Sequence, residues 1–158
     1  MFRPMLRAKQ QLPQEECIRL LKERPRGVLS VIGDDGYPYC APINHFYNEE
    51  DGRIYFHSGP QGHRIDAFRA DPKACFCLTD GGAPVEGEWY LQFRSVVVFG
   101  RIQEVTDHEK ALEISRRLSY KFTSDRDYIE DEVRRSGPRV LCFCLIPEHI
   151  TGKRVNEK

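Results

Sequence analysis

The sequence predicts a mainly β (α+β) fold, an antiparallel barrel with peripheral helices, and three observations lead to this prediction. About six runs of strand-forming residues follow one another at short spacing, separated by turns rich in glycine and aspartate. Helical patterns are set between and around these runs. No repeat, low-complexity tract or linker divides the chain, so we expect a single domain over residues 1–158.

The first half of the chain contains one predicted helix followed by three predicted strands. The helix covers residues 13–24, where Pro13 suits the first turn and apolar residues form a stripe. The strands cover 28–32, 37–47 and 53–57. Turn residues separate them, with Gly33-Asp34-Asp35-Gly36 as the stronger turn signal. We therefore expect a meander of three consecutive antiparallel strands.

A second helix is expected after Gly62, ending at Asp71-Pro72. The strands predicted after it cover 74–79, about 89–105 and 140–146. Between the last two, Thr106 and Glu109 form a capping box that opens a helix, with Thr106 as N-cap. The apolar side of that helix is expected to carry Ala111, Ile114, Leu118 and Phe122. A further helix starts at Ser124-Asp125.

The charge balance excludes several classes of partner. The chain has 24 basic and 24 acidic residues and a formal net charge of zero. No long basic block is present, so we expect no nucleic-acid partner. No apolar stretch approaches the length of a membrane span, and no apolar region follows the arginine-containing start MFRPMLRAK. We therefore expect a cytoplasmic protein without a membrane segment.

Six cysteines include two C-x-C pairs, each inside an apolar run. They are Cys75 with Cys77 and Cys142 with Cys144. Residues i and i+2 of a strand share a face, so reduced thiols that pack as small hydrophobic side chains are the favoured interpretation, with no metal. The alternatives are a four-thiolate metal site, if the two strands are neighbours, and redox pairing.

The stretch from Tyr55 to Pro72 carries the clearest functional signal. A strand ending at His57 breaks at Ser58-Gly59-Pro60-Gln61-Gly62, and a helical pattern opens at His63-Arg64. Such a joint gathers free backbone N–H groups at the positive end of a helix dipole, which favours an anion. The side chains of Ser58 and Arg64 can add donors to a phosphate. The alternative is a solvated strand–loop–helix joint, since no Walker or dinucleotide motif is present.

Four segments in order resemble one known family. They are GVLSVIGDDGYPYCAPINHFY, IYFHSGPQGHRIDAFRADP, SVVVFGRIQEV and PEHITGK. They resemble the FMN-binding split-barrel proteins of the pyridoxamine 5'-phosphate oxidase superfamily, and within it the subgroup similar to 5-nitroimidazole reductases. The resemblance covers nearly the whole chain. It implies a six-stranded antiparallel Greek-key split barrel that forms a homodimer, with one FMN in each of two clefts between the subunits.

The resemblance also implies a set of site residues. The cofactor-binding residues are Leu29, Ser30, Pro42, Ile43, Asn44, His57, Ser58, His63, Arg64 and Ser95. The residues implied to bind the phosphate are His57, Ser58, His63 and Arg64. The flavin ring is implied to lie along the edge of the second strand, with the first strand and Ser95 nearby. His57 is the implied catalytic residue. To donate a proton it must face the flavin cleft and be protonated near neutral pH.

The function implied is an FMN-dependent oxidoreductase that reduces a small electrophile such as a nitroimidazole or nitroaromatic, with a nicotinamide or another reductant as electron donor. The alternative is a non-catalytic module that stores or senses flavin, and a third interpretation is a barrel that binds haem or another planar cofactor. Vitamin B6 oxidation is not expected. The chain ends at PEHITGKRVNEK, without the arginine- and tryptophan-bearing segment that those oxidases use for the vitamin.

Overall fold

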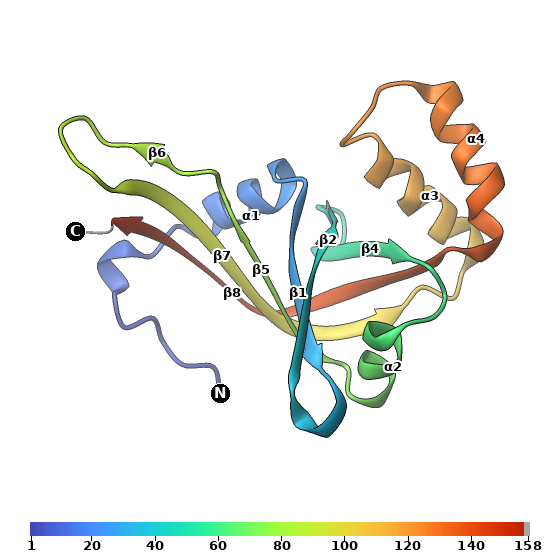
Figure 1. Cartoon of the computed structure of the whole chain (residues 1–158), viewed down its shortest axis with the longest axis horizontal. Coiled ribbons are helices and arrows are strands. Elements are labelled where there is room, and N and C mark those ends of the chain that lie inside the picture. The colour runs from blue at the N-terminus through green and yellow to red at the C-terminus, as the bar shows by residue number, and fades with distance from the viewer. Residues whose placement is uncertain (157–158) are drawn as a thin grey trace.

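The computed structural model describes residues 1–156, and this part of the chain folds around one antiparallel sheet (Figure 1). Its strands are β1 (Arg26–Ile32), β2 (Pro38–Asn44), β3 (Phe46–Asn48), β4 (Arg53–Ser58), β5 (Lys73–Thr79), β6 (Ala83–Pro84), β7 (Leu91–Glu104) and β8 (Leu141–Asn156). The α-helices are α1 (Gln14–Glu23), α2 (His63–Ala70), α3 (His108–Ser119) and α4 (Arg126–Ser136). Single 3-10 turns occupy Ala8–Gln10, Asp34–Gly36 and Gly137–Arg139. None of the described helices is long and apolar enough to cross a membrane.

The strand order shows why the sheet curls into a barrel. Hydrogen-bonded neighbours follow the path β2-β1-β5-β7-β8-β4-β3, with β6 beside β7. The two ends of this path, β2 and β3, are joined in the chain by the single residue His45. The sheet must therefore bend until its ends approach each other. If β2 and β3 are taken as one interrupted strand and the two-residue β6 is set aside, the predicted six strands of the barrel are confirmed.

The hydrophobic core fills the concave side of this sheet. Alternate residues of β5 face inward, so Ala74, Phe76 and Leu78 are buried. Cys75 and Cys77 lie on the opposite face and are only half-buried, so the expectation of packed core thiols is wrong for this pair and confirmed for Cys142 and Cys144. A second, smaller cluster lies under α3, where Ala111 and Ile114 pack against Tyr55 and the Cys142–Cys144 pair. In Figure 1, α3 and α4 lie together at one end of the sheet.

The predicted meander of three strands is present in an interrupted form, because β1 pairs with β2 and β3 pairs with β4, both antiparallel, while the middle strand is divided in two. β2 pairs with β1, but β4 pairs with β3 and β8, so β2 and β4 belong to opposite ends of the path. The predicted strand 37–47 is interrupted at His45. That ring is fully buried, and its Nε2 lies 2.6 Å from the Leu21 carbonyl oxygen on α1. Anchoring this side chain inside the protein breaks the strand and sends β3 to a new partner.

Two helix predictions also need correction. The N-cap of α3 is Asp107 rather than Thr106, because the Asp107 carboxylate accepts the bond from the Lys110 backbone N–H. Phe122 lies beyond the end of α3 and is 46% exposed, so it does not extend the apolar stripe. The start of α4 is as predicted, with Asp125 accepting from the Tyr128 N–H.

The last strand is much longer than predicted. β8 continues from Leu141 to Asn156 and pairs with β7 along its length, with a register shift at Phe99/Gly100. Gly100 is required there, because a Cβ at this position would lie 2.1 Å from the Ile146 carbonyl oxygen.

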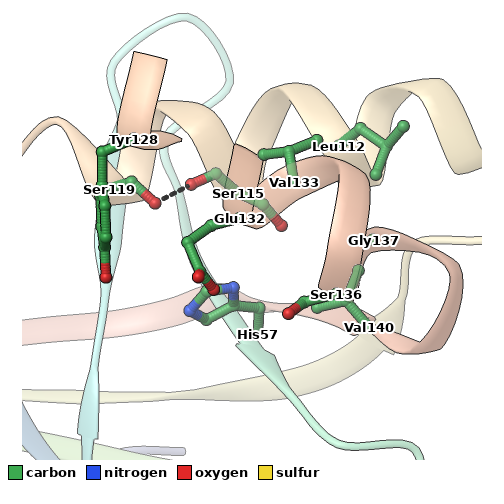
Figure 2. A pocket seen from close by; sticks show the side chains of 10 residues that line it. All are labelled: His57, Leu112, Ser115, Ser119, Tyr128, Glu132, Val133, Ser136, Gly137 and Val140. Atoms are coloured by element: carbon green, nitrogen blue, oxygen red, sulfur yellow. Dashed lines mark hydrogen bonds between the residues drawn. The ribbon is translucent and has the colours of Figure 1, made fainter. Parts of the chain in front are cut away.

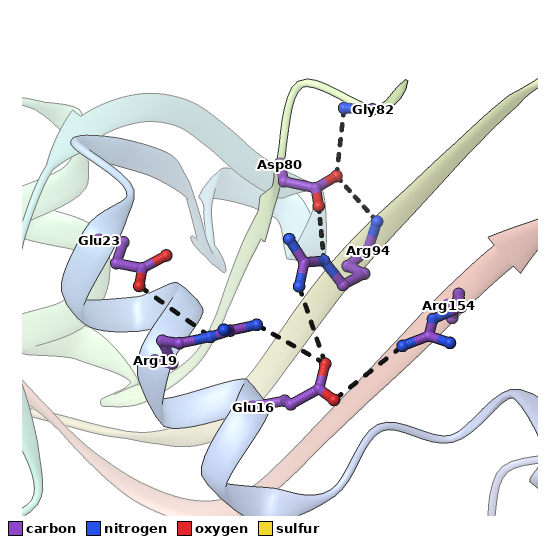
Figure 3. A network of polar contacts seen from close by, with 7 residues as sticks. All are labelled: Glu16, Arg19, Glu23, Asp80, Gly82, Arg94 and Arg154. Atoms are coloured by element: carbon purple, nitrogen blue, oxygen red, sulfur yellow. Dashed lines mark hydrogen bonds and ion pairs between the residues drawn. The ribbon is translucent and has the colours of Figure 1, made fainter. Parts of the chain in front are cut away.

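Helix α1 is fastened to the far ends of β7 and β8 by a network of ion pairs (Figure 3). Glu16 lies within 4.0 Å of nitrogens of Arg19, Arg94 and Arg154. Arg94 Nε also donates to Asp80 at 2.7 Å, and this partner holds the pKa of the Asp80 carboxyl below its usual range despite burial, which opposes the shift. The network is structural, because each carboxylate in it faces an arginine.

The cysteines are free thiols in the described structure. The condition for a four-thiolate site is not met, because β7 lies between β5 and β8 in the sheet. Within residues 1–156 no group of three or more metal-ligating side chains comes together. Burial raises the pKa of Cys142 to about 12, which keeps this thiol protonated and unreactive at neutral pH.

Candidate flavin site

The predicted anion site lies where β4 ends and α2 begins. His57 and Ser58 are the last residues of β4, and His63 and Arg64 are the first of α2. Gly62 is the N-cap residue of α2 and has φ 137°, a conformation that favours glycine. No side chain caps this end of the helix, and although the Ile65 N–H donates to the Gly62 carbonyl oxygen at 2.9 Å, the N–H groups of His63 and Arg64 point out of the helix end, where they can meet an anion.

Arg64 provides the second observation at this site. Its Nε is buried and has no hydrogen-bond partner in the described structure. A buried guanidinium N–H without an acceptor is costly, and an anionic oxygen is the group that would satisfy it. Together with the uncapped helix end, it fits a phosphate group.

His63 has a different environment from Arg64. Its ring packs against Tyr39 of β2, with ring centroids 4.3 Å apart, and its Nε2 lies 3.7 Å from Asp34 Oδ2. These contacts tie the start of α2 to the β1–β2 hairpin. The hairpin therefore brings the edge of β2 beside the anion site, which the sequence alone did not indicate.

His57 faces away from the core toward the helical pair α3 and α4. It lines a pocket of about 210 Å³ that the sequence did not predict (Figure 2). It also lines an outer cavity of about 490 Å³, whose wall includes Ser58, Gly59 and Pro60 at the end of β4 and in the loop before α2. Burial lowers the pKa of the His57 imidazole, so the neutral ring dominates at pH 7, contrary to the expectation for a proton donor.

The residues expected along the flavin ring divide between two faces. Leu29 is fully buried and Ile43 is 9% exposed, and both belong to the core, so only their backbone could contact a ligand. Ser30 and Pro42 alternate with them and face the other way, and Asn44 is half-buried at the end of β2. Since β2 pairs only with β1, its outer edge offers unpaired backbone groups.

Ser95 lies on a different stretch of the sheet from His57. Its partner on β8 is Lys153, whereas the partner of His57 is Cys142. These partners are separated by eleven positions along β8, or roughly 36 Å of extended strand at about 3.3 Å per residue. The strand pairing therefore does not place Ser95 beside the end of β4.

The side of the sheet that faces away from the core carries an apolar surface, which we call the outer face. Its residues come from β1, β2, β5 and β7, and they are Val28, Ser30, Ile32, Cys40, Pro42, Cys75, Cys77, Val97 and Phe99. Val28, Ile32 and Phe99 are 38–43% exposed, and the charged residues of the same strand faces, Arg26, Lys73 and Arg101, lie at its margins. Phe2 from the N-terminal segment stacks on Phe99 at one margin. Such a surface is typical of a protein interface.

Sequence reasoning missed the wall of the His57 pocket, which α3 and α4 supply. The residues are Leu112, Ser115, Ser119, Tyr128, Glu132, Val133, Ser136, Gly137 and Val140. One feature of the sequence could have indicated this wall. Ser115 and Ser119 lie four residues apart next to the apolar stripe of α3, where polar side chains are unexpected. The wall residues from Tyr128 to Val140 follow His57 by more than 70 positions in the chain, and local patterns cannot show that they contact it.

The antiparallel barrel, the uncapped start of α2 and the buried Nε of Arg64 therefore occur together in one small protein. The family model described as pyridoxamine 5'-phosphate oxidase matches residues 13–154, and the chain belongs to this family. No curated protein matches the sequence.

Solved structures with the same fold are distant in sequence. A candidate 5-nitroimidazole antibiotic resistance protein from Bacteroides thetaiotaomicron is 18% identical, with 91% of this chain and 86% of that chain covered and a TM-score of 0.77. The conserved hypothetical protein Rv2991 from Mycobacterium tuberculosis is 18% identical, with 96% and 90% covered and a TM-score of 0.82. An FAD-binding protein from Mycobacterium smegmatis is 21% identical, with 94% and 99% covered and a TM-score of 0.66. At these identities the likeness shows the fold.

Proposed function

We propose that this chain is a cytoplasmic flavoprotein that binds FMN noncovalently, with the phosphate at the start of α2. The observation that supports this most directly is the buried, unpartnered Nε of Arg64 beside an uncapped helix end. Family membership and the flavin-binding neighbours agree with it. Ser58 and the backbone N–H groups of the first turn would add hydrogen bonds, and the free edge of β2 would lie along the ring.

A second copy of the chain completes the proposed site. The centre of the outer face is apolar, and Ser95 and His57 pair with positions of β8 that are eleven residues apart. A symmetric dimer that buries the outer face would cover this surface and bring residues of the partner to the flavin.

The proposed reaction is reduction of a small electrophile such as a nitroimidazole or nitroaromatic, with a nicotinamide or another reductant as donor. When bound, the flavin supplies the electron transfer. His57 is the proposed catalytic residue. Because burial lowers its pKa, its imidazolium fraction grows as the pH falls below neutral, so a proton-donating role predicts faster reduction at pH 6 than at pH 7.5.

Cofactor binding is tested by titrating the purified chain with FMN, riboflavin and FAD. We expect FMN to bind far more tightly than riboflavin, because the phosphate supplies much of the affinity. Arg64→Ala should weaken FMN binding by about 10- to 150-fold, the equivalent of about 1.5–3 kcal/mol for a charge-assisted contact. Arg69→Ala is the matched control, since Arg69 lies on the same helix but is paired with Glu104. Equal affinities for FMN and riboflavin would contradict the proposal.

The catalytic role of His57 is tested by single-turnover reduction of a nitroimidazole by the prereduced, FMN-saturated protein. We expect His57→Ala to react at least tenfold more slowly, because general acids contribute about 10²-fold or more. If variant and wild type react at the same rate, His57 contributes to FMN binding and has no catalytic role. If neither reacts while FMN is bound, the result favours the alternative function, a module that stores or senses flavin.

A further inference from the structure

The pocket behind His57 is enclosed by the helical pair α3 and α4 on one side and the end of β4 on the other (Figure 2). Its volume of about 210 Å³ exceeds the 150 Å³ or so of an apolar cavity known to accept benzene. It shares His57, Glu132, Ser136 and Val140 with the outer cavity, which reaches Ser58 and Gly59. The pocket is therefore large enough for one substituted ring and is continuous with the proposed cofactor loop.

The pocket wall combines apolar side chains with four hydroxyl groups, and the hydrogens of two of these are already used in hydrogen bonds. Leu112, Val133 and Val140 supply the apolar surface. Ser115 Oγ donates to the Ala111 carbonyl at 2.9 Å, and Ser119 Oγ donates to the Ser115 carbonyl at 2.8 Å. These two hydroxyls can therefore only accept from a ligand.

Glu132 adds an acidic acceptor to the same space. Figure 2 shows its carboxylate extending from α4 toward the pocket, while the His57 ring enters from the sheet side. Arg135 donates to Glu132 Oε1 from the next turn of the helix, which leaves Oε2 as an acceptor. An exposed pair of this kind is weak and is screened by water, so the carboxylate retains its preference for a positive or donor-bearing group.

We propose that this pocket is the substrate subsite, and that it selects a single aromatic ring carrying an N–H donor or a positive charge and rejects an anionic ring. The inference rests on the proposed function, because it assigns the ring that the flavin would reduce. His57 lies at the boundary between the two cavities, and so it is placed between a ring in this pocket and a cofactor held at Ser58.

The test uses benzylamine and benzoate, which are close in size and opposite in charge. Their binding to the full chain is measured by isothermal titration calorimetry, with and without FMN. We expect benzylamine to bind at least tenfold more tightly than benzoate. Val133→Phe fills the pocket and should reduce benzylamine affinity at least tenfold. Val85→Phe is its control, because Val85 lies in the β6–β7 connection, away from this pocket.

Glu132→Gln is the second variant and keeps the shape of the side chain while removing its charge. It should weaken benzylamine binding to the FMN-free chain several-fold and reduce the difference in affinity between benzylamine and benzoate. Equal affinity for the two probes, a preference for benzoate, or unchanged benzylamine binding in Val133→Phe overturns the inference. Binding of both probes is also measured on the FMN-free chain. A failure to bind FMN therefore overturns the proposed function without affecting the test of the pocket.

Discussion

The buried imidazole of His45 predicts a specific loss of stability in acid. The ring is 0% exposed and contacts Phe76 edge-on, with ring centroids 4.9 Å apart. Because a carbonyl oxygen only accepts, His45 Nε2 carries the hydrogen that it donates to the Leu21 carbonyl oxygen. Nδ1 is then a buried lone pair with no partner, and the Lys121 ammonium donates to the His45 carbonyl oxygen at 2.8 Å. A proton on Nδ1 would place a second positive charge in this region.

Burial, followed by the charge of Lys121, lowers the pKa of His45 from 6.5 to about 3, against the opposing effect of the bond to Leu21. Unfolded His45 takes up a proton as the pH falls below 6.5, whereas folded His45 does so only near pH 3. Between these values the unfolded state binds more protons, so the free energy of unfolding decreases as the pH falls. At about 1.4 kcal/mol per pH unit, the loss at pH 5 is about 2 kcal/mol.

The measurement is urea unfolding of wild type and His45→Gln at pH 7.5 and pH 5. Gln keeps a donor for the Leu21 carbonyl and does not titrate. Lys121, with its pKa lowered by burial to about 8, is mostly protonated at pH 7.5 and more fully so at pH 5. We expect wild type to lose about 2 kcal/mol more than His45→Gln between the two pH values. Equal losses would refute the reasoning, because every other titrating group is common to both proteins.

Two further predictions concern the sheet. Gly100→Ala should destabilise the fold by about 2 kcal/mol or more in urea unfolding, because the new Cβ would meet the Ile146 carbonyl; Gly81→Ala, where nothing lies within 4 Å, should change stability by less than about 0.5 kcal/mol. Light scattering should give a dimer of the 18.4 kDa chain, and Phe99→Glu on the outer face should give a monomer; a wild-type monomer with FMN fully bound contradicts the proposed dimer.

Local patterns were sufficient for much of the fold. Pro13 and the apolar stripe that follows it predicted α1. The run from Tyr55 to Arg64 predicted the strand–loop–helix joint and the free N–H groups at the start of its helix. These features depend on side chains within a few positions of one another, so the sequence contains the physical information that decides them.

The pairing of the strands depended on contacts between distant residues. The bond from His45 to the Leu21 carbonyl interrupts a continuous strand-forming run, and no local propensity could indicate it. The approach of α4 to His57 is likewise a contact across more than 70 residues, and it converts a strand-end histidine into the floor of a pocket. The sequence by itself determined most of the barrel strands and the strand–loop–helix joint between β4 and α2, because they follow from side-chain period and turn chemistry. Only the tertiary structure decided what His57 faces and that Ser95 pairs with a distant part of β8, because both depend on how the sheet curls and which elements pack against its end.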